Sequence, residues 1–211
     1  MKIYPDENGR EGKGILFVIS SPSGGGKSTI ARRLIAALSG IVISVSHTTR
    51  EPRQGEVDGS EYHFVSPEEF ERIRAGGGFV EWAEVYGEFY GTSRKEIDRI
   101  TGTGKDVLLD IDVQGGQQIR ERFSGAVLIF VVPPERAELE KRLQKRGTES
   151  PDQINRRLAA EAGELALIPY YDYAIRNDDL EEAFCAVRSI ITAERCRVSR
   201  RANNEVSARR Y

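Results

Sequence analysis

The stretch with the clearest chemical content is residues 20–29, SSPSGGGKST, in which a lysine and two hydroxyl residues follow three glycines. Gly26-Lys27-Ser28 fits the second half of the phosphate-binding pattern G-x-x-x-x-G-K-[ST], but Ser21 stands where the pattern has its first glycine. Glycines let backbone N–H groups approach a phosphate, and a following helix adds unpaired N–H groups. Lys27 can then reach the β- and γ-phosphates of a nucleotide, and Ser28 can coordinate Mg²⁺. The alternative, a flexible glycine turn, explains neither the Lys-Ser pair nor the apolar run before it.

An acidic pair ends a second apolar run, VLLDID, in which Asp110 and Asp112 are two residues apart. On an extended strand the two carboxylates would project to the same face. Beside a phosphate loop, a carboxylate at the end of a buried strand helps to order Mg²⁺ and its waters. The alternative is an ordinary acidic pair at a strand end.

Two arginines bracket a proline in the stretch SVSHTTREPRQGEVDGSEY, where Arg50 and Arg53 flank Pro52. The proline restricts the backbone on both sides. Two guanidinium groups held close together suit a phosphate monoester, because each donates two N–H bonds in a fork. With Glu51 and Glu56 nearby, a solvated basic loop is the alternative interpretation.

The elements that must position these residues follow from the apolar periodicity. A helix follows the glycine loop and ends near Gly40, and an amphipathic helix covers 180–197. Between Glu61 and Thr92, short aromatic segments separated by glycines predict a small antiparallel lobe, interrupted by a helix that begins at Ser66. Strand-length apolar runs predict a buried parallel sheet, at Ile15–Ser20, Ile41–Val45, Val107–Asp112, Ala126–Val132 and Tyr173–Ile175.

A charged segment over residues 133–157 predicts two helices joined at Gly147. Ser150-Pro151-Asp152-Gln153 is typical of a helix start, with an N-cap serine, a proline at the first position and a capping-box glutamine. Arg142 and Arg146 are four residues apart and share one helix face, and Arg157 opens the next helix. A solvated pair of charged helices is the alternative.

The composition is that of an ordinary globular protein, because 39% of the 211 residues are hydrophobic and 30% charged. A net charge of −2 argues against a general nucleic-acid binder. Cys185 and Cys196 would lie roughly 16 Å apart on one helix, too far for a disulfide. No apolar run is long enough for a membrane span, and the first residues lack the apolar core of a signal peptide. We therefore expect a soluble, cytoplasmic protein with no nucleic-acid or membrane partner.

These motifs resemble, in order and spacing, those of guanylate kinases. The resemblance runs from about Ile15 to the helix after residue 180 and rests on SVSHTTREPRQGEVDGSEY, EWAEV, YGTS, LLDIDVQG and KRLQKRGTES. It implies a P-loop NTPase-type α/β fold: a three-layer core with a parallel sheet, a small mixed α/β GMP-binding lobe and a helical lid. We expect the core over 14–45 and 103–197, the GMP-binding lobe over 46–102, the lid over 133–157 within the core, a flexible lead-in over 1–13 and a tail over 198–211.

The activity implied by the resemblance is transfer of the γ-phosphoryl group of ATP to GMP, giving ADP and GDP, with Mg²⁺ as cofactor. The residues implied for ATP are Ser21, Pro22, Ser23, Gly24, Gly25, Gly26, Lys27, Ser28 and Thr29, with Asn177 and Asp178 near adenine. Ser28 is the implied metal residue, and Arg142, Arg146 and Arg157 lie around the phosphates.

For GMP, the resemblance implies that Arg50, Arg53, Tyr62 and Tyr90 hold the phosphate. Glu81 would accept bonds from guanine N1–H and the 2-amino group, with Ser46 and Thr92 at the other edge of the base. Asp112 completes this recognition, Asp110 faces metal and phosphates, and Glu56 orders the lobe. A buried Glu81 facing adenine would be left unpaired, and such a mismatch can discriminate by about 10⁴-fold.

Two competing functions remain open. A nucleoside monophosphate kinase with another base preference would share the loop and the arginines. A scaffold domain resembling guanylate kinases would bind a phosphorylated partner without catalysis, although Lys27, Ser28 and the arginines of 133–157 argue against it. Trp82 is interpreted as a packing residue, and His47 and His63 form no evident metal or catalytic signature. The oligomeric state is not predicted.

Overall fold

The computed structural model describes residues 14–22, 24–134, 140 and 159–198. A five-stranded sheet forms its centre, in the order β2-β7-β1-β8-β9. Every neighbouring pair in this sheet is parallel, as the sequence predicts. The strands are β1 Leu16–Ser20, β2 Ile41–Ile43, β7 Asp106–Asp110, β8 Val127–Val132 and β9 Tyr173–Arg176.

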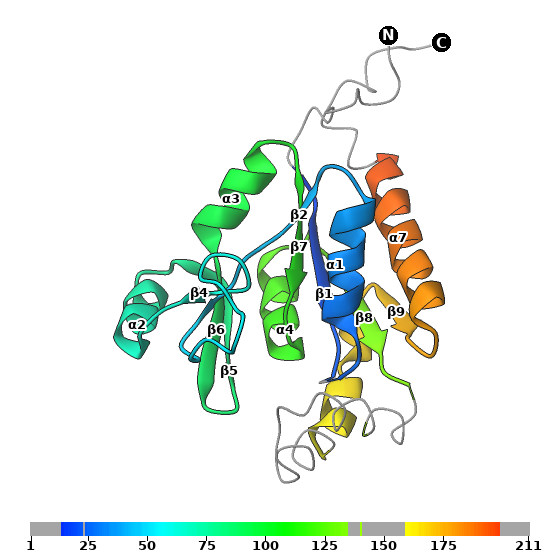
Figure 1. The fold of residues 1–211 in the computed structure, drawn as a ribbon. Coiled ribbons are helices and arrows are strands. Elements are labelled where there is room, and N and C mark those ends of the chain that lie inside the picture. The colour runs from blue at the N-terminus through cyan, green and yellow to red at the C-terminus, as the bar shows by residue number, and fades with distance from the viewer. Residues whose placement is uncertain (1–13, 23, 135–139, 141–158, 199–211) are drawn as a thin grey trace.

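Helices cover both faces of this sheet, which gives the predicted three layers (Figure 1). Because side chains alternate along a strand, Phe17 and Ile19 of β1 face one side and Val18 the other. The first side packs against α1 (Lys27–Ala37) and α7 (Leu180–Cys196), and the second against α3 (Arg94–Gly102) and α4 (Val113–Arg122). The central strands are therefore buried on both faces, as their unbroken apolar runs indicate.

A second, four-stranded sheet lies beside the core, in the order β4-β3-β6-β5. Together with helix α2 (Pro67–Ala75) it forms what we call the small lobe. Its α2 begins as predicted, because the Ser66 side chain accepts a hydrogen bond from the Glu69 N–H and Pro67 takes the first helical position. The strands are β3 His47–Thr48, β4 His63–Phe64, β5 Phe79–Val85 and β6 Glu88–Ser93.

The prediction of an antiparallel lobe is wrong in one pair of strands. β5–β6 and β3–β6 are antiparallel, but β3 and β4 are parallel, with His47 opposite His63. A parallel pair needs a long connection, and residues 49–62 provide one here. The small lobe is therefore a mixed sheet. The division of the chain at residues 46 and 102 stays a prediction.

A buried aspartate joins the closing helix to the central sheet at the amino ends of its strands. Asp106 of β7 is 0% exposed and accepts hydrogen bonds from the Ile15 N–H and from Arg195 Nε, both at 2.9 Å. Arg195 of α7 also donates to the Ser39 carbonyl at 3.0 Å. A charge buried in this way needs its partner, so the contact fixes α7 against β7 and β1.

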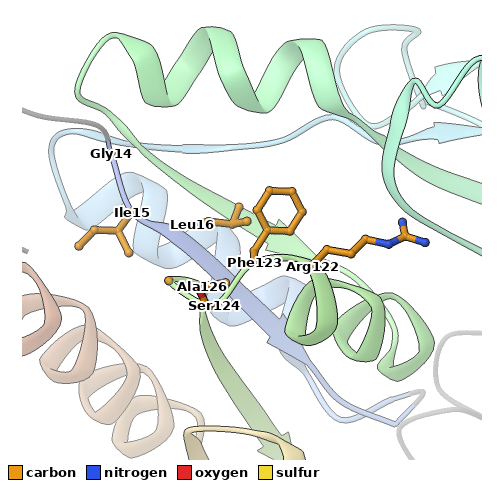
Figure 2. A pocket seen from close by; sticks show the side chains of 8 residues that line it. Gly14, Ile15, Leu16, Arg122, Phe123, Ser124 and Ala126 are labelled. Carbon is orange, nitrogen blue, oxygen red and sulfur yellow. The ribbon is translucent and has the colours of Figure 1, made fainter.

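A groove of about 410 Å³ opens at the same end of the sheet, lined by residues 14–16 and 122–126 (Figure 2). Ligands of open α/β sheets bind at the carboxyl ends of the strands, and this groove lies at the other end of β1 from the glycine loop. None of the predicted site residues lines it. In the described part of the chain, no helix has the length and apolarity to cross a membrane. Cys185 and Cys196 are free thiols, as predicted.

Candidate active site

The glycine loop connects β1, the central strand of the sheet, to α1. Gly24 and Gly26 have φ values of 86° and 93°, in the left-handed region that favours glycine. The Gly25 N–H donates to the Pro22 carbonyl at 3.0 Å and closes the turn. No side chain of the described residues caps α1, so its first N–H groups stay available to an anion. Ser28 and Thr29 lie in this first turn.

Ser21, which replaces the first glycine of the pattern, is buried in the loop against Gly25. Its side chain is 5% exposed, and its hydroxyl donates to the Pro22 carbonyl at 3.0 Å. A Cβ atom on Gly25 would lie only 2.8 Å from the Ser21 hydroxyl oxygen. The serine is therefore accommodated because the residue it faces across the turn has no side chain.

Lys27 and Asp110 form an ion pair at the carboxyl end of the sheet, with Nζ and Oδ1 3.0 Å apart. Burial lowers the pKa of the Lys27 ammonium, but the charge and hydrogen bond of Asp110, together with the charges of Tyr62 and Asp112, outweigh this effect, so the pKa lies above its ordinary value. Lys27 is therefore positively charged at neutral pH and suited to bind phosphate oxygens.

Asn177 follows β9 and contacts the loop from the other side. Its amide nitrogen donates to the Gly25 carbonyl at 2.7 Å, and its side chain is 1% exposed. The amide oxygen is buried without a hydrogen-bond partner in the described part of the chain. Asp178 lies at the surface, where it pairs with Arg176 at 2.8 Å. The structure thus brings Asn177, but not the side chain of Asp178, to the glycine loop.

An arginine of the small lobe is held by a carboxylate. One guanidinium nitrogen of Arg50 donates to both oxygens of Glu56, at 3.0 and 2.9 Å, and its carbon lies 5.4 Å from the centre of the Tyr62 ring. The Arg53 N–H donates to the same carboxylate at 2.8 Å. The Tyr62 and Tyr90 rings stand edge to face, 5.8 Å apart. The predicted phosphate-binding residues of this lobe are thus adjacent.

Glu81 of β5 is a buried carboxyl without a cationic partner at hydrogen-bonding distance in the described part of the chain. It is 3% exposed and accepts a hydrogen bond from the Thr92 hydroxyl. Since this hydroxyl has one proton, Ser46 is the donor in the 3.3 Å contact between the Ser46 and Thr92 oxygens. Burial, together with the charge of Asp112, raises the pKa of the Glu81 carboxyl to about 7, against the effect of the Thr92 hydrogen bond.

The prediction that Asp110 and Asp112 share one face of a strand is wrong. β7 ends at Asp110, and Asp112 is the N-cap of α4, where its Oδ1 accepts from the Gly115 N–H at 2.9 Å. An aspartate satisfies the unpaired N–H groups of a helix start, and this need ends the strand early. Both carboxylates still lie close to Lys27, which pairs with Asp110 at 3.0 Å and acts electrostatically on the pKa of Asp112.

The remaining predicted residues fall into two groups. Ser23, Arg142, Arg146 and Arg157 lie outside the described residues, as does the predicted lid apart from residues 133, 134 and 140. Trp82 packs as predicted, against Phe89 and under the Arg74 guanidinium. The His47 and His63 rings lie 4.8 Å apart, but no metal-binding group of three or more His, Cys, Asp or Glu occurs among the described residues.

Sequence reasoning did not identify two residues that touch this site. The Ser20 hydroxyl donates to the Asp112 carbonyl at 3.2 Å, and the Gly115 N–H contacts the Asp112 carboxylate. The apolar run predicts only that Ser20 ends a strand, and nothing in the glycine-loop pattern indicates a role for its hydroxyl. Gly115 carries a signal, because a glycine within a helical pattern usually has a packing or functional reason.

The central parallel sheet, the glycine loop before α1, and the Lys27–Asp110 pair at the end of the neighbouring strand define a P-loop NTPase-type protein. The guanylate kinase family model matches residues 13–194. The chain therefore belongs to the guanylate kinase family.

Individual relatives agree with this assignment. The chain is 50% identical to a guanylate kinase of Symbiobacterium thermophilum over 89% of both chains. It is 51% identical to one of Rhizobium etli, over 90% of this chain and 86% of that one. A crystal structure of guanylate kinase from Anaplasma phagocytophilum aligns with a TM-score of 0.73 at 37% identity, covering 90% of each chain.

Proposed function

We propose that the protein transfers the γ-phosphoryl group of ATP to GMP, giving ADP and GDP. The observation that carries this proposal is the Glu81 carboxyl, buried in the small lobe, held by Thr92 and electrostatically coupled to Asp112. Guanine presents two adjacent donors, N1–H and the 2-amino group, to such a carboxylate, whereas adenine presents an acceptor at N1. Binding adenine would leave Glu81 unpaired, which is a strong basis for selecting guanine.

The GMP phosphate is assigned to the arginines and tyrosines of the small lobe, Arg50, Arg53, Tyr62 and Tyr90. Two guanidinium groups and two hydroxyls provide enough donors for a phosphate dianion. Glu56 holds the Arg50 side chain and the Arg53 backbone in place, as its hydrogen bonds indicate. This arrangement orders the loop before the nucleotide binds, so less entropy is lost on binding.

The ATP phosphates are assigned to the glycine loop and the start of α1. Lys27 neutralises charge on the transferred group, and this is the largest demand of phosphoryl transfer. The Asn177 amide, which donates to the Gly25 carbonyl, supports the assignment of Asn177 to the ATP side of the site. Roles for Asp178 near adenine and for Arg142, Arg146 and Arg157 around the phosphates stay predictions.

Mg²⁺ is proposed as the cofactor, because the Ser28 hydroxyl and the Asp110 carboxylate are the hard oxygen donors it prefers beside nucleotide phosphates. When bound, Mg²⁺ would neutralise part of the charge on the phosphates. No side-chain general base is needed, since the GMP phosphate is already an anion near neutral pH. Lys27 and the arginines orient the two phosphates, and closure of the lobes would exclude water.

We further propose a cytoplasmic protein whose partners are ATP and GMP, with no nucleic-acid or membrane partner. A coupled assay of ADP formation from ATP, Mg²⁺ and GMP tests the activity. Calorimetric titration with ATP separates the enzyme from a non-catalytic scaffold domain. GMP-dependent ADP formation with measurable ATP binding supports the proposal, and GMP binding without ATP binding would overturn it.

A further inference from the structure

Helix α4 carries two consecutive glycines in its first turn, Gly115 and Gly116. Glycine weakens a helix relative to alanine, so two in one turn need a reason. Gly115 is not among the residues with positive φ, so its backbone conformation is open to any residue. Its lack of a side chain must therefore matter for what lies next to it.

The neighbour of Gly115 is the carboxyl group of Glu81. A Cβ atom on Gly115 would lie 2.5 Å from Glu81 Oε2 and 3.1 Å from its Cδ, and also 3.1 Å from the Cδ1 of Ile111. Cβ atoms do not approach an oxygen this closely, so the carboxyl would have to move. It is 3% exposed and accepts a hydrogen bond from Thr92 through its other oxygen. Any displacement of the Glu81 carboxyl therefore distorts its hydrogen bond with Thr92 and changes the direction in which the carboxyl points.

Gly115 contacts the second carboxylate of the site as well. Its N–H donates to Asp112 Oδ1 at 2.9 Å. Glu81 approaches the same residue at the position that a Cβ atom would occupy. Glu81 belongs to the small lobe and Asp112 to the core, at the junction of β7 and α4. Gly115 therefore lies between the two carboxylates and contacts both.

We propose that Gly115 positions Glu81 for recognition of the base. Because Gly115 has no side chain, nothing separates the first turn of α4 from the Glu81 carboxyl group, and the carboxyl can point toward the base. This inference rests on the proposed function, with GMP as the phosphoryl acceptor. Gly115 acts through Glu81 and Asp112 and is not itself catalytic. Substitution of Gly115 therefore affects recognition of the base and leaves ATP binding unchanged.

Gly115→Ala tests this in steady-state kinetics with GMP and with inosine monophosphate, which lacks the 2-amino group. We expect the KM for GMP to rise about tenfold or more, as for an impaired hydrogen bond to a charged group, while the KM for ATP stays within about twofold. The preference for GMP over inosine monophosphate falls. Gly163→Ala is the matched control, since Gly163 is helical with nothing within 4 Å of a Cβ. An unchanged KM for GMP and an unchanged preference would overturn the proposal.

A second measurement uses stability and needs no substrate. Gly115→Ala and Gly163→Ala are compared by urea unfolding in the natural chain and in a Glu81→Ala background. Relative to the control, we expect Gly115→Ala to cost more stability where Glu81 is present than where it is absent, because the contact with Ile111 occurs in both backgrounds and the contact with the carboxyl in only one. Equal effects in both backgrounds, or failure of the variant to fold in both, would overturn the contact. If the natural chain does not phosphorylate GMP, the proposed function fails, whereas this comparison still decides the contact.

Discussion

Replacing Glu81 with glutamine is expected to make the ligand-free protein less sensitive to pH. Burial is the main cause that raises the pKa of the Glu81 carboxyl from 4.5 to about 7. Between these two values the folded protein binds a proton that the unfolded chain has released. The stabilisation is thus fully present below pH 4.5 and is lost as the pH rises through about 7.

The size of the effect follows from the two pKa values. Each pH unit between 4.5 and about 7 corresponds to about 1.4 kcal/mol. Between pH 5 and pH 8 the natural chain therefore loses roughly 2–3 kcal/mol of unfolding free energy through this one carboxyl. Glutamine has nearly the same shape and does not titrate, so Glu81→Gln does not undergo this loss.

Urea unfolding of the natural chain and of Glu81→Gln at pH 5 and pH 8 tests this prediction. The contributions of all other titrating groups to the unfolding free energy are nearly the same in the two proteins, so they cancel in the difference. The variant is expected to gain roughly 2–3 kcal/mol relative to the natural chain over this range. Glu84→Gln is the control, since Glu84 lies on the same strand with an exposed side chain. A stability difference between variant and natural chain that is the same at both pH values would refute the raised pKa of the buried Glu81 carboxyl.

Three further predictions concern the loop and the core. Lys27→Ala is expected to lower kcat by about 10³-fold or more while GMP binding, measured by calorimetry, stays intact; full turnover would contradict its role. Ser21→Gly is expected to change the KM for ATP little, since Ser21 already fits against Gly25; a large improvement would show that serine impairs the loop. Arg195→Ala is expected to destabilise the fold by about 2 kcal/mol in urea unfolding, since it removes one charged partner of the buried Asp106 carboxylate, with both KM values unchanged. A smaller loss than about 1 kcal/mol would contradict that contact.

The core around the glycine loop could be predicted from the sequence because its signals are local. An apolar run, a glycine cluster and a helical pattern follow one another from Ile15 to Gly40, and β1 and α1 lie within them. The parallel sheet follows from unbroken apolar strands alternating with helices. The start of α2 at Ser66 was likewise set by neighbouring residues.

The parts that could not be predicted depend on contacts between distant residues. The parallel pairing of β3 with β4 arises because both are placed by the rest of the small lobe, and two-residue strands carry little pattern. The amide of Asn177 meets Gly25 across 152 positions of sequence. Asp112 looked like a strand residue because a carboxylate at a strand end and one at a helix start have the same local sequence.

The measurement that tests the central claim most directly is a coupled assay of ATP consumption with GMP, AMP, UMP and dTMP as acceptors. The buried Glu81, held by Thr92, predicts a kcat/KM for GMP at least about 10⁴-fold above that for AMP. Comparable rates with GMP and AMP, or a preference for a pyrimidine nucleotide, would contradict the assignment of Glu81 as the residue that reads guanine.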